Sequence, residues 1–338
     1  MYISISGEDR IAIYTVDPKS GGIEFAGETT VAGRPAPIAI SPNKKYLYVG
    51  QRENCRITSF QIDMATGSIT FVGQVSLESD PCFLSVDRTG RYLLSAYYNA
   101  GRVAIHPIDK HGALDTNPTE WLATETGAHS ILTDRSNQFA FVPHIADKGP
   151  NMILQFKFDE THGTLTPNSP SDILPAPNLG PRHYCFHPNK DILYFSNEQG
   201  SSVSGYHLDT FSGTLSHFQT ISTLPAGYTK PNACSQIQIT HSGRYLYAPN
   251  RGHNSIACFS INEVDGRLTT IGWTDSEPVP RAFSLDPSDK FLFAAGLDSG
   301  NLCSYQIVEN TGQLHHFSTT EVGKEPMWVL LTDLTSQD

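Results

Sequence analysis

Ser20-Gly21-Gly22-Ile23 is the first of seven copies of one polar turn, x-Gly-x-Leu/Ile, and this repeated turn decides the fold. The six later copies are Thr66-Gly67-Ser68-Ile69, His111-Gly112-Ala113-Leu114, His162-Gly163-Thr164-Leu165, Ser212-Gly213-Thr214-Leu215, Asp265-Gly266-Arg267-Leu268 and Thr311-Gly312-Gln313-Leu314. Successive glycines are 46, 45, 51, 50, 53 and 46 residues apart. Internal repeats of this length indicate a solenoid, a propeller or another repeat array.

The interior of each repeat favours the propeller, because it consists of short strands with little helical periodicity. A second turn precedes the glycine turn and runs into an aromatic or aliphatic segment, as in Asp87-Arg88-Thr89-Gly90-Arg91-Tyr92-Leu93-Leu94. A third segment, such as residues 56–62, alternates in the manner of a strand. We therefore predict four antiparallel strands, A to D, in each repeat, and an all-β, seven-bladed β-propeller.

The two ends of the chain predict how the ring closes. The first copy begins at residues 1–6, which align with strand B, so its strand A is missing. Residues 325–333 resemble an unattached strand A. One blade would then be shared between the N-terminal strands and a C-terminal strand, which leaves no open sheet edge. We expect residues 1–338 to form a single domain, although the length alone suggests about two.

Composition excludes several classes of partner. The net charge of −11 argues against nucleic acid and against an anionic membrane. No segment resembles a signal peptide or a membrane span. The six cysteines are scattered without a C-x-x-C motif, which favours reduced thiols. We expect a cytoplasmic protein, a monomer or weak homodimer, with neither metal nor cofactor.

Propeller geometry predicts where a site would lie. Strands A start at one face of the ring, and the turns between strands B and C lie on the same face, so both converge on one mouth of the central channel. The A starts supply His129, Arg182 and Arg281, and the B–C turns supply Glu198 and Arg251. A carboxylate among several cations in a channel mouth is costly to place without a use. The same turns add Asn99 and His144 as candidates for substrate binding.

Structural alternatives remain open for these residues. Arg182 and Glu198 could form an ion pair that only fills the channel. His183 follows Arg182, so strand alternation points it into the blade as a core histidine, although we keep it as a candidate for substrate binding. A metal site could be drawn from His129, His144 and Glu198, but their spacing matches no known ligand pattern.

The sequence lacks a G-x-G-x-x-G, a P-loop, a G-x-S-x-G and an H-E-x-x-H motif. It resembles, over essentially its whole length, the seven-bladed lactonase family of bacterial propeller-type 6-phosphogluconolactonases and fungal 3-carboxy-cis,cis-muconate lactonizing enzymes. The most specific part of the resemblance is Gly180-Pro181-Arg182-His183, followed by His187-Pro188 and Asn197-Glu198. The resemblance implies metal-independent chemistry, catalytic roles for His129, Arg182 and Glu198, and a further family arginine at Arg251.

These observations together predict a lactonase that hydrolyses an anionic sugar lactone, most simply 6-phospho-D-glucono-1,5-lactone to 6-phosphogluconate. Glu198 would be the general base, with His129 as its partner or as the acid for the ring oxygen. Arg182 would stabilise the oxyanion or hold the carboxylate end, and Arg251 and Arg281 would bind phosphate or another distal anion. The alternatives are a carboxymuconate-type lactonizing cycloisomerase, which needs no water as nucleophile, and a non-catalytic propeller that binds a ligand or a partner.

Overall fold

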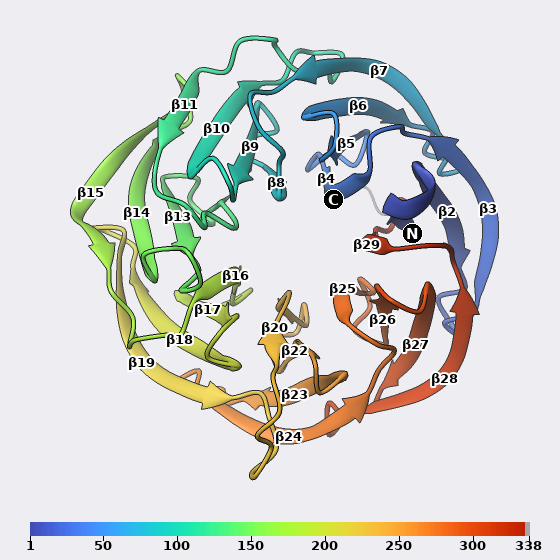
Figure 1. Cartoon of the computed structure of the whole chain (residues 1–338), viewed down its shortest axis with the longest axis vertical. Coiled ribbons are helices and arrows are strands. Elements are labelled where there is room, and N and C mark those ends of the chain that lie inside the picture. The colour runs from blue at the N-terminus through green and yellow to red at the C-terminus, as the bar shows by residue number, and fades with distance from the viewer. Residues whose placement is uncertain (335–338) are drawn as a thin grey trace.

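The computed structural model describes residues 1–334, and it is a ring of seven antiparallel sheets around a central axis (Figure 1). Each sheet has four strands, except that the innermost strand of one is broken in two. The one helical element of the described residues is a single 3-10 turn, η1 (Ser6–Glu8). Within that range no helix is long and apolar enough to cross a membrane. The prediction of an all-β, seven-bladed propeller is confirmed.

The strands take the same order, A to D, from the axis to the rim of every blade. Strands A are β4 (Pro35–Ile40), β8 (Phe83–Val86), β12 (Leu132–Thr133), β16 (Pro181–Phe186), β20 (Ala233–Cys234) with β21 (Gln238–Ile239), β25 (Pro280–Leu285) and β29 (Pro326–Leu330). Strands B are β1 (Tyr2–Ile5), β5 (Tyr46–Gln51), β9 (Tyr92–Tyr97), β13 (Phe139–His144), β17 (Ile192–Asn197), β22 (Tyr245–Arg251) and β26 (Phe291–Gly296).

The outer half of each blade completes the set. Strands C are β2 (Arg10–Val16), β6 (Arg56–Ile62), β10 (Arg102–Pro107), β14 (Met152–Asp159), β18 (Ser202–Asp209), β23 (Ser255–Ile261) and β27 (Asn301–Ile307). Strands D are β3 (Ile23–Thr30), β7 (Ile69–Ser76), β11 (Glu120–Ala123), β15 (Thr164–Ile173), β19 (Thr214–Ser222), β24 (Leu268–Asp275) and β28 (Leu314–Glu321). Strand β9 is buried at every position, whereas the rim strand β3 is mostly exposed, because neighbouring blades cover only the inner strands on both faces.

The ring closes as the sequence predicts. The C-terminal strand β29 pairs antiparallel with β1, with Ile3 opposite Val329 and Tyr2 opposite Leu330. Ile3 and Val329 are both buried. Figure 1 shows β29 beside the N-terminus, in the innermost place of the blade that β1, β2 and β3 complete. The first and last segments of the chain therefore share one sheet.

The glycine turn that marks each repeat also locks neighbouring blades together. Gly112 and Gly312 lie in C–D turns with φ of +82° and +69°, which favours glycine. A Cβ at either position would lie 2.2 Å from a ring atom of Tyr46 or Tyr245, each the first residue of strand B in the preceding blade. The glycine thus provides both the turn and the space for an aromatic ring. The glycine turn of one blade and the aromatic residue that begins strand B of the preceding blade therefore contact each other.

Candidate active site

A β-bulge recurs at the start of strand A and directs side chains toward the axis. In β16, Pro181 pairs with Asn197 and His183 pairs with Ser196, which leaves Arg182 as the extra residue. The same shift leaves Arg281 unpaired in β25 and Met327 unpaired in β29. A bulge re-aims the side chain at which it occurs, and such bulges are frequent next to active sites.

The bulge also corrects the expected orientation of His183. Simple alternation would point the imidazole into the blade, but the extra residue at Arg182 breaks that alternation. His183 and Arg182 consequently both line the central cavity. The imidazole is 4% exposed, and its Nε2 atom has no hydrogen-bond partner within the described chain. His183 is therefore not the satisfied core histidine that the sequence predicted.

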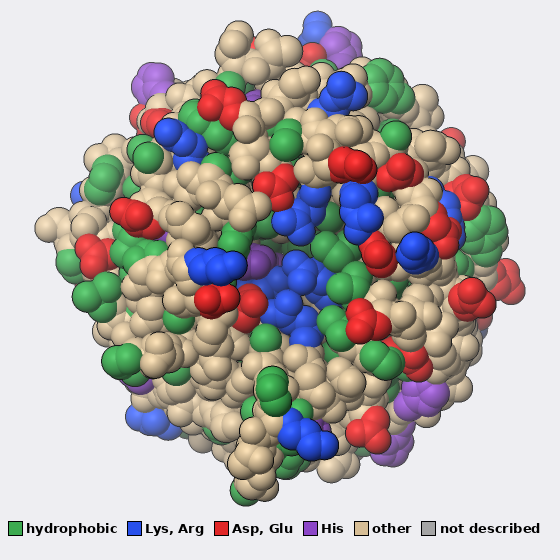
Figure 2. Space-filling model, in the orientation of Figure 1, with side chains coloured by type: hydrophobic (Ala, Val, Ile, Leu, Met, Phe, Trp, Pro, Cys, Tyr) green, Lys and Arg blue, Asp and Glu red, His purple; other side chains and the backbone are tan. Residues whose placement is uncertain are grey.

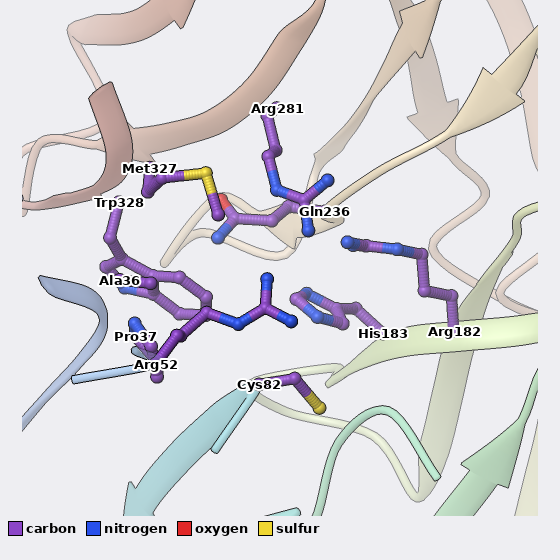
Figure 3. Close-up of a pocket in the computed structure, with 10 residues that line it drawn as sticks. All are labelled: Ala36, Pro37, Arg52, Cys82, Arg182, His183, Gln236, Arg281, Met327 and Trp328. Atoms are coloured by element: carbon purple, nitrogen blue, oxygen red, sulfur yellow. The ribbon is translucent and has the colours of Figure 1, made fainter. Parts of the chain in front are cut away.

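The cavity lies at one mouth of the channel, where Figure 2 shows a cluster of basic side chains at the centre of the ring. It is narrow: about 10 Å³ is open to the centre of a water molecule, within about 300 Å³ of space between the lining atoms that includes open solvent. Arg52, Arg182 and Arg281 point their guanidinium groups into it, as Figure 3 shows. The remaining wall is formed by His183, Gln236, Ala36, Pro37, Cys82, Met327 and Trp328.

Glu198 lies behind this wall, between two arginines. Its Oε2 atom is 2.7 Å from Nε of Arg182, and its Oε1 atom is 3.0 Å from Nη2 of Arg251. The contact with Arg182 is a close ion pair without the alignment of a hydrogen bond, and Nη1 of Arg182 has no partner within residues 1–334. Burial opposes ionisation of Glu198, but the two arginines outweigh it and lower the pKa of the carboxyl group. Glu198 is therefore a carboxylate at neutral pH.

The cavity carries an excess of positive charge. Arg52 pairs with Asp80 at 2.8 Å, and Glu198 is shared by Arg182 and Arg251. No carboxylate of the described residues pairs with Arg281. Burial, followed by the fields of Arg182, Arg251 and Arg52, lowers the pKa of Arg281 to about 9, so it stays charged at neutral pH. Four guanidinium groups and two carboxylates thus leave two positive charges uncompensated.

Two imidazoles stand side by side next to these charges. The ring centroids of His129 and His183 are 5.0 Å apart. Burial, and then the neighbouring Arg182, lowers the pKa of both well below the ordinary value. Both rings are therefore neutral at physiological pH. The Nδ1 atom of His129, like Nε2 of His183, lacks a hydrogen-bond partner in the described part of the chain.

Comparison with known proteins assigns the family. The family model "Lactonase, 7-bladed beta-propeller" matches residues 1–331. The chain belongs to this lactonase family. A relative from Yersinia pestis (strain Pestoides F), named 6-phosphogluconolactonase, is 35% identical over 331 residues, which cover 97% of this chain and 96% of the relative. A relative of the same name from Yersinia enterocolitica is 32% identical over 330 residues and 97% of each chain.

Solved structures agree on the fold of the lactonase family. The periplasmic gluconolactonase of Pseudomonas aeruginosa superposes with a TM-score of 0.88 at 22% identity and covers 96% of both chains. A protein from Lactobacillus plantarum gives a TM-score of 0.85 at 24% identity over 94% of both chains. At these identities the likeness concerns the architecture of the propeller.

The lactonase fold brings most of the predicted residues together, with two exceptions. His144 does not reach the cavity, because its imidazole is fully buried and its Nδ1 atom bonds the carbonyl oxygen of Val142 at 3.1 Å. Asn99 is exposed at the rim, where its Nδ2 donates to Oδ1 of Asp80 at 3.2 Å. Neither residue lines the cavity as it stands.

Seven of the ten residues that line the cavity were not predicted as site residues, and three of them, Arg52, Gln236 and Trp328, carry polar or aromatic side chains that could bind a ligand. Arg52 and Trp328 belong to stretches that the repeat marks as a B–C turn and an A start, but their side-chain directions depend on local turn and bulge geometry. Gln236 lies within the break between β20 and β21, which no periodic pattern signals. Apart from their place in these stretches, no sequence signal points to the three residues.

Proposed function

We propose that this chain is a cytoplasmic lactonase that hydrolyses the ring ester of 6-phospho-D-glucono-1,5-lactone to 6-phosphogluconate. The observation that supports this most is the cavity with two uncompensated positive charges beside neutral imidazoles. Such an excess of positive charge suits a doubly negative ester. The names of the Yersinia relatives support the same substrate. Six free cysteines suit a reducing compartment.

Ester hydrolysis requires an activated water and a stabilised oxyanion. In our proposal, water attacks the lactone carbonyl carbon while Nε2 of His183 accepts one of its protons. The carbonyl oxygen becomes an oxyanion, which the unpartnered Nη1 of Arg182 stabilises. The bond between the carbonyl carbon and the ring oxygen then breaks, and the imidazolium returns its proton to that oxygen. The second proton of the attacking water remains on the new carboxyl group, which then releases it to solvent.

Glu198 takes a different role here from the general base that the sequence suggested. Its pKa is lowered, and protonation would leave Arg182 and Arg251 without their counter-ion. Both oxygens of Glu198 already face arginines, whereas Nε2 of His183 has no partner among the described residues and lines the cavity, so the geometry favours His183 as the proton acceptor. We assign Glu198 as a positioning residue, which orients Arg182 toward the carbonyl oxygen. His129 packs edge-on against the ring of His183, and we assign it the role of holding that ring in place.

A comparison of two histidine variants tests the assignment. Removal of a general base typically costs roughly 10²- to 10⁴-fold in rate. We expect the kcat of His183→Gln on the phosphorylated lactone to fall to this extent. Its melting temperature should stay within a few degrees of the wild-type value. His129→Gln should lose less, since it acts through His183. If His129→Gln is the more damaged and His183→Gln turns over normally, His129 is the proton acceptor and our assignment is wrong.

A further inference from the structure

We infer that Arg52, Gln236 and Arg281 form the subsite for the phosphate group of the substrate, with Asp80 as the residue that positions Arg52. This inference rests on the proposed function, because it concerns the same cavity and the same lactone. It replaces the sequence-based expectation that Arg251 and Arg281 hold the distal anion.

Arg52 is fixed in the cavity wall from one side only. Its Nη2 and Nε atoms donate to Oδ2 of Asp80 at 2.8 and 3.2 Å. The other oxygen of Asp80 accepts from Asn99 at the rim. These contacts hold one edge of the guanidinium plane and leave Nη1 to the cavity, into which Figure 3 shows the group pointing from the side of Pro37 and Trp328. A planar, immobilised guanidinium suits bidentate recognition of an oxyanion.

Gln236 and Arg281 supply the other donors. The Oε1 atom of Gln236 accepts the backbone N–H of Phe283 at 3.0 Å, so its Nε2 group is left as a donor. The side chain is 5% exposed and lines the cavity. Arg281 lies beside it in Figure 3 and has no ion-pair partner within residues 1–334. A buried amide donor and an unpaired guanidinium facing one cavity are expected of an anion site.

Arg251 is unsuited to this task because it does not line the cavity, and its Nη2 atom is already engaged elsewhere. That atom donates to the carbonyl oxygen of Cys234 at 2.7 Å and lies 3.0 Å from Glu198. In Figure 3, Arg182 and Arg52 enter the cavity from opposite sides, so the oxyanion donor Arg182 lies across from the proposed phosphate donor Arg52.

The charge favours phosphate over carboxylate at the subsite. A phosphate monoester carries a charge of roughly −1.5 to −2 at pH 7, whereas a carboxylate carries one. Only the former balances the two uncompensated charges of the cavity.

The test compares two lactones that differ only in the phosphate. For the wild type, Arg52→Gln, Arg281→Gln and Asp80→Asn, the ratio kcat/KM is measured with the phosphorylated lactone and with glucono-1,5-lactone. A lost charge-assisted hydrogen bond is expected to lower the preference for the phosphorylated lactone roughly 10- to 100-fold. The loss should fall on KM more than on kcat. Asp80→Asn leaves Arg52 in place but removes its ion-pair partner, so the preference for the phosphorylated lactone should fall less than in Arg52→Gln. Arg52→Lys keeps the charge and should retain part of the preference that Arg52→Gln loses.

The control is Arg34→Gln, which removes a positive charge from the rim of the same mouth. Arg34 is half exposed and pairs with Glu325. Inorganic phosphate is the second probe: its inhibition constant against the phosphorylated lactone should rise in Arg52→Gln and Arg281→Gln but stay unchanged in Arg34→Gln.

Two outcomes overturn the inference, and a third concerns the proposed function instead. If Arg52→Gln keeps its melting temperature and its preference for the phosphorylated lactone, the subsite is wrong. It is also wrong if Arg34→Gln lowers the preference as much as Arg52→Gln, because long-range attraction would then explain the effect. If the wild type hydrolyses neither lactone, the proposed function fails.

Discussion

Glu198→Gln tests how far the buried ion pairs support both fold and catalysis. The substitution keeps the shape of the side chain and removes its charge, so Arg182 and Arg251 lose their shared counter-ion. Breaking a buried pair by removing one partner costs about 3–5 kcal/mol. The Glu198 side chain is 17% exposed, and water can solvate part of the arginines. We therefore expect about 3 kcal/mol of lost stability, the low end of that range.

The same variant should lose turnover. Without Glu198 to orient it, Arg182 would stabilise the oxyanion poorly, and one misplaced donor of this kind costs roughly 10²- to 10³-fold in kcat. The KM should change little, because the phosphate contacts remain. Glu198→Asp keeps the charge and should recover part of both properties. Urea denaturation gives the free energy of unfolding, and acid release from the phosphorylated lactone gives kcat and KM.

The control is Glu309→Gln, a change of the same kind at an exposed position. It should leave both stability and kcat at wild-type values. The positioning role of Glu198 is refuted if Glu198→Gln unfolds at the wild-type urea concentration with normal kcat. If the variant is as stable as the wild type but inactive, Glu198 acts in the chemistry itself and the role of general base returns.

Two further predictions concern the whole ring. A chain truncated before Glu325 should fail to fold in soluble form, because β1 would lose its partner strand β29; a soluble truncate with the wild-type melting temperature would contradict ring closure by this strand. Acid should destabilise the protein, because burial lowers the pKa of His106 and His144 to about 4, and that of His129 and His183 well below its usual value. Their contribution is complete above the unfolded pKa of 6.5 and is lost as the pH falls toward the folded values, by roughly 1.4 kcal/mol per pH unit for each histidine. Equal free energies of unfolding at pH 7.5 and pH 5 would contradict this.

The fold could be predicted because its signals are local and repeated. The glycine turn and the aromatic start of strand B recur along the chain. The contact between them, such as that of Gly112 with Tyr46, therefore recurs between blades. The shared blade could be predicted because the missing strand A and the unattached one complement each other. The residues at the mouth followed from topology, which places all A starts and B–C turns on one face.

The directions and partners of individual site side chains could not be predicted, because they depend on local geometry that the repeat pattern does not encode. The bulge at Arg182 turned His183 into the cavity, against the alternation that its sequence position predicts. His144 stands in a turn expected at the mouth but is fully buried. The pair of Arg182 with Glu198 was weighed from the sequence, but the partner of Arg52 was hidden, because Asp80 precedes its strand A and lies outside both the A starts and the B–C turns. Such an ion pair joins residues from neighbouring blades, so it depends on their distance in the folded protein and not on their spacing in the sequence.

The most direct test of the central claim is acid release from freshly generated 6-phospho-D-glucono-1,5-lactone by the purified protein, followed beside glucono-1,5-lactone and 3-carboxy-cis,cis-muconate. We predict hydrolysis well above the spontaneous rate, with a kcat/KM for the phosphorylated lactone at least roughly tenfold above that for the unphosphorylated one. We also predict no ring closure of the muconate. A spontaneous rate with the phosphorylated lactone, or lactone formation from the muconate, would contradict the proposed function.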